Sequence, residues 1–439
     1  MVRNPETSRF TSRTAFGALV LILFAAVLSG CGSRVAGTPA AGEINIRNLG
    51  VGTYPTDPLD VRVRQSFGSN PGTAVAMARL TDSVVNGADV DAKFAHNVVS
   101  EPLWNAVALP SKKILGSAFV PVLESNGMLF GFSSASSTHE LATPAPRGSE
   151  VPIAFSPFAG AQVDTHATSF TVTVLQFPDP PKAKTAAEQL EAADFANAAD
   201  RNVHVDLAGR PDAKAHWQPG VPALTATLAH GSYVVIVHVD QPTPDLDGLR
   251  KFTEQVFTAQ LPLLDQAPAL SPRDYFRMQF DPDTMMRRTL HPRDYTSLDA
   301  VAEITGTPRG YLHYVDDHAA LWRLLDDNGV DRFSTAKVGG LLFRARDAKA
   351  AAALWSGINK TTTASVEAPP NVPDVACTET PHPESGASVS RNDTWDLANK
   401  YICTLHYDRY VARVASNQLI DAQQKAAAQY ALLAKSQYL

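Results

Sequence analysis

Cysteine, charge and long apolar runs are all scarce in this sequence. Three cysteines among 439 residues are too few for a disulfide-rich scaffold or a Cys-rich metal site. Charged residues make up 19% of the chain, and the net charge of −6 argues against nucleic acid as the main partner. No segment reaches the roughly 18 consecutive apolar residues of a spanning helix, which excludes a polytopic membrane protein. A hydrophobic content of 44% still supports real cores, over a length typical of two or three domains.

The motifs of the common enzyme classes are also missing from the sequence. It contains no P-loop, no Gly-rich dinucleotide turn, no nucleophile elbow and no HExxH. We therefore expect no cofactor and no catalytic metal, and we favour a binding protein over an enzyme.

The first thirty residues have the layout of a bacterial lipoprotein signal. Three arginines in the first 13 residues precede an apolar run at 15–28, which is too short to span a membrane by itself. The run ends in Leu28-Ser29-Gly30-Cys31, where small residues fit a signal peptidase and the cysteine offers a thiol for diacylglyceryl transfer. The alternative is a secretory peptide with a chance cysteine. We predict a signal peptide at residues 1–30 and lipidation of Cys31.

Lipidation would decide where the mature protein is located. Two or three acyl chains, palmitate among them, hold a protein stably on a membrane. Residues 31–43 are mostly small and polar, which is typical of a flexible tether that follows the lipidated cysteine. We expect the protein on the extracytoplasmic face of the cell membrane, with the membrane as a partner through the lipid anchor.

The two other cysteines, Cys377 and Cys403, suit the same compartment. In an oxidising exterior, a pair of cysteines is more often bridged than free. The residues between them are polar and cannot be held in place by burial. Closing a loop of about 25 residues would stabilise the fold by roughly 3–4 kcal/mol. We predict a disulfide; two free thiols for metal binding or catalysis are the alternative.

Hydrophobic periodicity predicts a first α+β domain at residues 44–263. Its N-terminal part contains an amphipathic stretch at 74–86 and an apolar, strand-like run at 115–122. The later elements follow in the order strand, helix, hairpin and helix, at residues 168–177, 184–199, 223–239 and 245–261.

A second domain at residues 273–439 repeats this order after a Pro-bearing stretch at 264–272 that we interpret as a boundary. Strand, helix, hairpin and helix are predicted at residues 337–344, 347–358, 401–414 and 419–436. The two hairpins also match at a constant offset of 177 residues, which pairs Thr227-Leu228 with Thr404-Leu405, Tyr233-Val234 with Tyr410-Val411, and Gln241 with Gln418. A chance match of common element orders is the alternative to an internal duplication.

These observations predict an α+β fold of two related units, each an antiparallel sheet with helices packed on one face. The chain resembles a family of two-domain lipoproteins of unknown function from mycolic-acid-bearing actinobacteria. The resemblance rests on Cys31, on GTYPTDP at 52–58 and on the chain end at 407–437. It implies a surface location and a two-domain build, and it provides no catalytic or binding residues.

Three groups of residues are candidates for chemistry. His313-Tyr314-Val315-Asp316-Asp317-His318 could hold a divalent ion on a helix face, but acids at this position also cap the helical run that follows. The pairs His204/Asp206 and His238/Asp240 each place an imidazole beside a carboxylate on one strand face. Such a pair is half of a nucleophilic triad, and a polar pair at a sheet edge is the simpler interpretation.

Met285-Met286-Arg287-Arg288 is either a patch that faces a membrane or partner, or a packed turn with solvated arginines. For the whole chain we expect a membrane-anchored binding or interaction module for an unknown small-molecule, lipid or protein ligand, held between the two units. The alternatives are a cell-envelope hydrolase that uses a His/Asp pair, and a lipid carrier with a large apolar cavity.

Overall fold

The structure is a computed structural model that describes residues 44–60, 69–143, 162–292, 303–315, 318–336, 340–360, 364–380 and 399–439. The predicted signal peptide, Cys31 and the tether lie outside the described residues. Within the described ranges, no helix has the length and apolar character needed to cross a bilayer.

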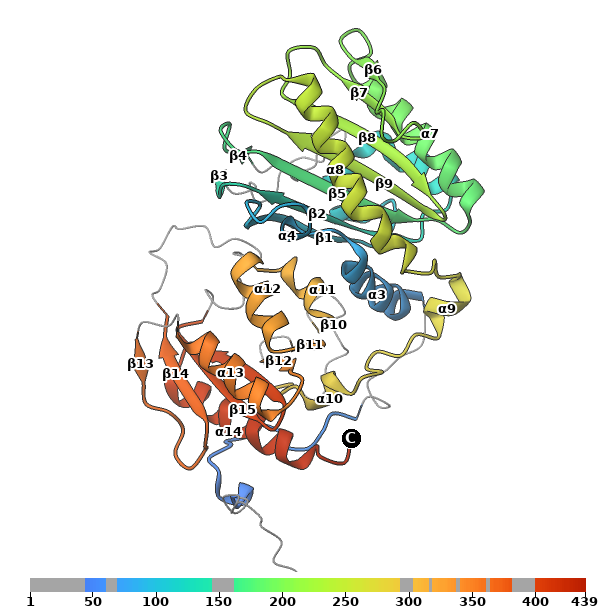
Figure 1. Ribbon diagram of the computed structural model, residues 1–439. Coiled ribbons are helices and arrows are strands. Elements are labelled where there is room, and N and C mark those ends of the chain that lie inside the picture. Colours follow the sequence, from blue (N-terminus) through green and yellow to red (C-terminus); the bar gives the residue numbers. More distant parts are fainter. Residues whose placement is uncertain are drawn as a thin grey trace, which may run out of the picture. The chain divides into compact units, whose positions relative to one another are not determined.

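A seven-stranded antiparallel sheet forms the centre of the first unit (Figure 1). Its strand order is β1-β2-β5-β9-β8-β7-β6. The strands span His96–Leu103 (β1), Phe130–Ser137 (β2), Ser169–Gln176 (β5), Tyr233–Asp240 (β9), Ala223–His230 (β8), Lys214–Trp217 (β7) and Val203–Val205 (β6). Two short strands, β3 (Leu141–Thr143) and β4 (Gln162–Val163), pair separately.

The second unit contains another seven-stranded antiparallel sheet with the same connectivity, in the order β10-β11-β12-β16-β15-β14-β13. Its strands span Thr305–Gly306 (β10), Arg332–Ala336 (β11), Gly340–Arg344 (β12), Tyr410–Ser416 (β16), Tyr401–Tyr407 (β15), Val375–Glu379 (β14) and Ser365–Val366 (β13). In both sheets the third strand pairs with the last, and the remaining strands follow in reverse order.

The same two helices recur in both units. After the third strand come α7 (Pro180–Ala196) and α13 (Ala348–Asn359), and after the last strand come α8 (Leu246–Asp265) and α14 (Leu419–Lys435). The carboxylates of Asp179 and Asp347 accept a backbone N–H in the first turn of α7 and α13, which fixes where each helix begins. The hairpins share their register, because Leu228 pairs with Val235 and Leu405 with Ala412, both at the 177-residue offset. The prediction of two related α+β units is confirmed.

Helices cover both faces of each sheet, so the expected placement on one face is wrong. In the first sheet, Val172 and Val174 join a core cluster with α8, while Leu175 and Ile236 join another with α7. The physical reason is that every residue of β5 is buried, so both faces of that strand need cover.

The second sheet is covered in the same way. The His406 ring lies 5.6 Å from that of Trp355 on α13, and the ring of the next residue, Tyr407, lies 5.1 Å from that of Tyr430 on α14. Adjacent strand residues point to opposite faces, so α13 and α14 lie on opposite sides of the sheet.

The predicted strand at 115–122 is helical. It covers the end of α5 (Leu109–Leu115), the turn η3 (Ser117–Phe119) and the start of α6 (Val120–Ser125). Gly116, at φ +77°, ends α5, and a proline in the first turn of α6 starts the next helix. A short apolar run does not by itself distinguish a strand from a buried helix.

Shorter helical segments complete the described fold. They are η1 (Ile46–Asn48), α3 (Ser69–Leu80), η2 (Thr81–Ser83), α4 (Gly87–Val90), α9 (Pro272–Phe276), α10 (Met285–Arg288), α11 (Pro308–Leu312) and α12 (His318–Asp327). The amphipathic stretch at 74–86 falls on α3, η2 and the residues that follow.

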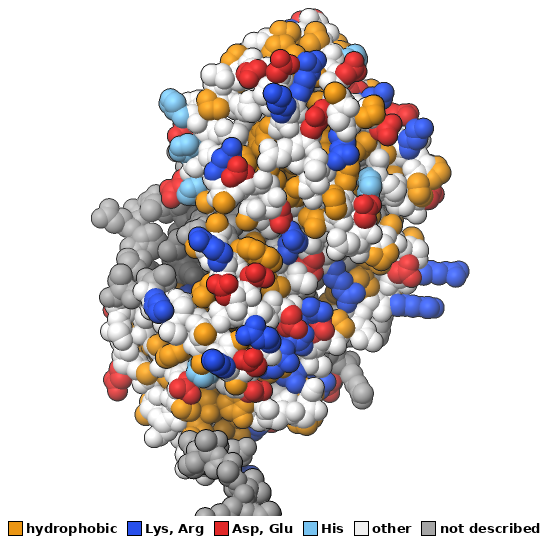
Figure 2. Space-filling model, viewed as in Figure 1, with side chains coloured by type: hydrophobic (Ala, Val, Ile, Leu, Met, Phe, Trp, Pro, Cys, Tyr) orange, Lys and Arg blue, Asp and Glu red, His pale blue; other side chains and the backbone are white. Residues whose placement is uncertain are grey.

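The Met285–Arg288 segment, α10, is packed within the second unit. Met285 and Met286 are 0% and 1% exposed. Arg288, expected to be solvated, is instead buried, with its guanidinium carbon 5.3 Å from the ring centre of Tyr410 and a hydrogen bond to the carbonyl of Ser436. Acidic and basic side chains are otherwise interspersed over the face drawn in Figure 2.

A disulfide joins Cys377 of β14 to Cys403 of β15, with the sulfur atoms 2.03 Å apart. The two cysteines are direct partners in the strand register. The bridge thus closes the polar segment between β14 and β15 at its base, as the sequence predicts.

Candidate functional site

A row of polar side chains crosses five strands on the face of the first sheet that α7 covers. His204 pairs with His216, His216 with Thr225, Thr225 with His238, and His238 with Thr171. Cross-strand partners share a face of a sheet, so these five side chains lie in one line, which we call the polar row.

Helix α7 adds two carboxylates to this row, Glu191 and Asp194, which are one turn apart. Glu191 Oε1 lies 3.4 Å from His216 Nδ1 and 3.6 Å from His204 Nδ1. His216 Nε2 lies 3.7 Å from Asp194 Oδ2. One imidazole of the row therefore lies between two carboxylates of the helix.

The end of the row at β6 is open to solvent. The side chain of His204 is 70% exposed, whereas those of His216 and Glu191 are about nine-tenths buried. Phe195 stacks on the His204 ring at 4.2 Å and meets the His216 ring edge-on at 5.7 Å. The polar row therefore has an exposed imidazole at its β6 end and buried polar side chains next to it.

Several buried atoms along this face lack hydrogen bonds. Among the described residues, Glu191 Oε1, His216 Nδ1, Thr171 Oγ1 and Ser169 Oγ make no hydrogen bond. Buried polar atoms are nearly always paired in native proteins, because an unpaired one carries its full desolvation cost. These four atoms make this face a candidate binding surface.

His238 links a hydroxyl to a carboxylate at the centre of the row. Its Nδ1 lies 2.8 Å from Thr225 Oγ1, and its Nε2 lies 3.1 Å from Asp240 Oδ2. Burial alone would lower the pKa of His238, but the carboxylates of Asp240 and Asp194 outweigh it and raise that pKa. The protonated imidazole is thereby favoured in the folded protein.

The structure brings one of the two predicted His/Asp pairs together and not the other. His238 and Asp240 lie together as expected, whereas His204 contacts Glu191 of α7 rather than the exposed Asp206. Sequence reasoning missed His216, Glu191 and Asp194, because strand register and helix placement bring them together. The one available signal was the spacing of Glu191 and Asp194, which puts both on one helix face.

The predicted His313 cluster serves a packing role. His313 is fully buried, with Nδ1 2.8 Å from Ser134 Oγ and Nε2 3.1 Å from the carbonyls of Thr81 and Val84. Both ring nitrogens are therefore engaged. Asp316, Asp317 and the side chain of His318 lie outside the described residues, and the described part of the chain contains no group of three metal-ligating side chains arranged for an ion.

Two pockets lie where the segments of the two units meet. One, of about 190 Å³, is lined by Asn86, Ala88, Asp89, Arg309, Leu312 and Trp322. Its charges are already satisfied, because Arg309 pairs with Asp89 and lies 6.0 Å from the ring centre of Trp322.

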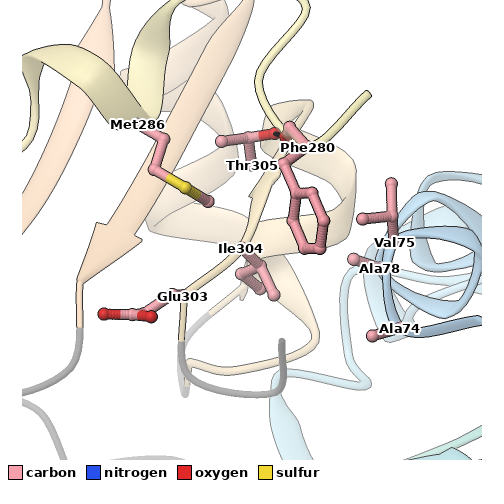
Figure 3. Close-up of a pocket in the computed structure, with 8 residues that line it drawn as sticks. All are labelled: Ala74, Val75, Ala78, Phe280, Met286, Glu303, Ile304 and Thr305. Carbon is pink, nitrogen blue, oxygen red and sulfur yellow. Dashed lines mark hydrogen bonds between the residues drawn. The ribbon is translucent and has the colours of Figure 1, made fainter. Parts of the chain in front are cut away.

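The other pocket holds about 10 Å³, close to the space of one water molecule. Figure 3 shows the reason, because the Phe280 ring fills the space between Ile304 and Thr305 on one side and Val75 and Ala78 of α3 on the other.

Comparisons with known proteins identify a family for the chain. The extracellular domain of PknH from Mycobacterium tuberculosis matches at 16% identity, covering 44% of this chain and 98% of that chain, with a TM-score of 0.26. No curated protein matches the sequence. The family models for the N-terminal and C-terminal parts of a domain of unknown function, DUF7373, match residues 68–280 and 285–436. The chain therefore belongs to the DUF7373 family, whose two parts it contains in order.

Proposed function

We propose that this chain is a lipid-anchored extracytoplasmic binding protein, and that the polar row with Glu191 and Asp194 is its recognition site. The order of basic, apolar and small residues before Cys31 supports the anchor. The Cys377–Cys403 disulfide supports an oxidising compartment.

The observation that carries the recognition site is the unpaired state of Glu191 Oε1 and His216 Nδ1. Both atoms are buried and face each other at 3.4 Å without a hydrogen bond between described residues. A ligand with polar hydrogen-bonding groups would satisfy them, entering past the exposed ring of His204.

Divergence between the two units supports the same conclusion. At the 177-residue offset, Thr225 and His238 correspond to Ile402 and Ala415, which occupy the same paired position in the second sheet. The fold itself therefore does not require polar groups at these positions. The second unit therefore does not repeat the polar row at these two positions.

A ligand site between the two units is less well supported than the polar row. His313 is hydrogen-bonded to Ser134 of the first sheet, and Phe280 lines a pocket of only about 10 Å³. Neither the 10 Å³ nor the 190 Å³ pocket offers the several hundred Å³ that a lipid carrier needs.

Metabolic labelling with an alkyne-bearing fatty acid tests the anchor. We expect the wild type to take up label and to fractionate with membranes, and the Cys31→Ser variant to do neither. An unlabelled wild-type protein, or a labelled Cys31→Ser variant, would contradict the anchor.

Native mass spectrometry of the protein released from its own membrane tests the recognition site. We expect the wild type to carry a bound adduct that Glu191→Gln loses. Glu188→Gln, a change at an exposed position one turn earlier on α7, is the matched control and should keep the adduct. Identical spectra for all three proteins would count against the site.

A second candidate function is hydrolysis by the triad Thr225, His238 and Asp240. The threonine hydroxyl lies 2.8 Å from the imidazole, and the imidazole lies 3.1 Å from the carboxylate. Against it, Thr225 lies inside β8 between β7 and β9, whose ladders occupy the neighbouring backbone amides that an oxyanion hole would use. A fluorophosphonate probe that labels the wild type but not Thr225→Val would favour hydrolysis; equal labelling would exclude this threonine as the nucleophile.

A further inference from the structure

The residues that follow the tether do not join the first sheet; they cross α14 of the second unit. We call residues 46–60 the strap. The Tyr54 hydroxyl donates to Asp421 in the first turn of α14, and Lys425 lies 3.1 Å from the same carboxylate. At the other end of the helix, Lys435 donates to Thr56 and Asp57 at 2.7 and 3.0 Å.

Further contacts hold the strap on both sides of this crossing. Gly52 adopts φ +59° so close to α14 that an added Cβ would lie 2.5 Å from the amide oxygen of Gln424. Leu59 exchanges two hydrogen bonds of 3.3 Å with Arg287 of α10. The chain thus enters this part of the fold beside the first half of α14.

The length of chain before the strap limits how far this entry point can lie from the lipid. Fourteen residues separate Cys31 from Ile46. Their contour is at most about 50 Å. In a protein acylated at Cys31, the point where the strap meets α14 therefore lies within about 50 Å of the bilayer.

Two exposed apolar side chains lie at opposite ends of the same helix. Ile420, in the first turn of α14, is 68% exposed, and Tyr438, just after the helix, is 75% exposed. Hydrophobic side chains also cluster near the lower end of the face drawn in Figure 2. An exposed aliphatic side chain such as Ile420 is suited to insertion at the boundary between lipid headgroups and acyl chains.

We propose that the surface formed by the strap and the first turn of α14, with Ile420, contacts the phospholipid bilayer that carries the protein's own anchor. This inference rests on the proposed lipidation of Cys31 and specifies which surface of the anchored protein meets the membrane.

Energy transfer on reconstituted protein tests the contact. The full-length lipidated protein is placed in vesicles of phosphatidylethanolamine and phosphatidylglycerol with a trace of rhodamine-labelled lipid. A fluorescent amino acid is introduced at Ile420 or, in a matched variant, at Val203, an exposed aliphatic position 43% accessible in β6 of the first unit. We expect several-fold stronger quenching from position 420 than from position 203.

Lysine acetylation of the unmutated protein gives an independent readout. Lys400, whose backbone N–H bonds to Asn417 just before α14, should be protected when vesicles are added. Lys93 of the first unit, with a 58% exposed side chain, should not.

Equal or reversed quenching together with unprotected Lys400 on vesicle-bound protein would overturn the proposed contact while leaving the anchor intact. A protein that fails to associate with vesicles would overturn the anchor, and the contact with it.

Discussion

At the scale of single residues, His238 makes the first unit sensitive to pH. Its pKa is raised in the folded protein by Asp240 and Asp194 despite burial. A raised pKa means that the folded state binds the proton more tightly, so the pair stabilises the fold below about pH 6.5, and this contribution is lost as pH rises through the folded pKa.

We therefore predict that Asp240→Asn flattens the pH dependence of stability. Between mildly acidic and mildly alkaline solution, the wild type should lose up to about 1 kcal/mol more unfolding free energy than Asp240→Asn. Urea unfolding at a series of pH values measures this difference. Parallel curves would mean that His238 does not titrate with Asp240.

His313 is a second residue whose effect can be predicted. Its ring bonds to Ser134, Thr81 and Val84 with no exposure to solvent. We expect His313→Phe to lower the unfolding free energy by about 2–4 kcal/mol, because it leaves buried polar groups unpaired. His166→Phe, at a side chain that is 87% exposed, should change it little. Equal effects of the two changes in urea unfolding would disprove the packing role.

At the scale of elements, the strap and the disulfide fix the second unit by different means. Burial, together with the hydrogen bond to Asp421, raises the pKa of Tyr54 far above its usual range. Burial would raise the pKa of Asp421, but its hydrogen bonds with Ser416, Tyr54 and Lys425 outweigh burial and lower that pKa. The contact therefore joins a neutral phenol to a charged acceptor, the stronger kind of hydrogen bond.

Tyr54→Phe removes this bond without changing the ring. We expect it to destabilise the protein by about 1–2 kcal/mol and to increase protease cleavage within residues 46–60. Tyr438→Phe, at a 75% exposed side chain, is the control and should behave as the wild type. Unchanged cleavage in Tyr54→Phe would show that the other strap contacts suffice.

The disulfide joins β14 and β15, two neighbouring strands of the second sheet. Replacing both Cys377 and Cys403 by serine should cost about 3–4 kcal/mol, because the unfolded chain regains the freedom of the 26-residue separation. Thermal unfolding of wild type and double variant, each with and without reductant, measures this cost. A double variant as stable as the oxidised wild type would contradict it.

At the scale of the whole molecule, local patterns predicted most of the second half of each unit. The alternation of apolar and polar residues predicted the hairpins at 223–239 and 401–414, and the helical spacing of apolar residues predicted α8 and α14. The run at 115–122 was misread, because a short apolar segment fits either structure and Gly116 decides between them.

The candidate site was only half predictable. His238 and Asp240 are two residues apart on one strand, so their proximity follows from the sequence. His216 and Glu191 meet only because β7 pairs with β8 and because α7 lies on that face. Neither the strand order nor the covering of both faces is encoded in a local pattern.

One further consequence follows from β1, the eight-residue strand at one end of the first sheet. A long outermost strand is a template for unwanted pairing between copies, which leads to aggregation. Here Asn97 and Ser100 of β1 donate to the carbonyl of His313, so the later half of the chain contacts this outermost strand. Both outermost strands of the second sheet are only two residues long and offer little to pair with. We therefore expect the first unit, if released alone, to self-associate, because β1 would lose its contact with the second unit.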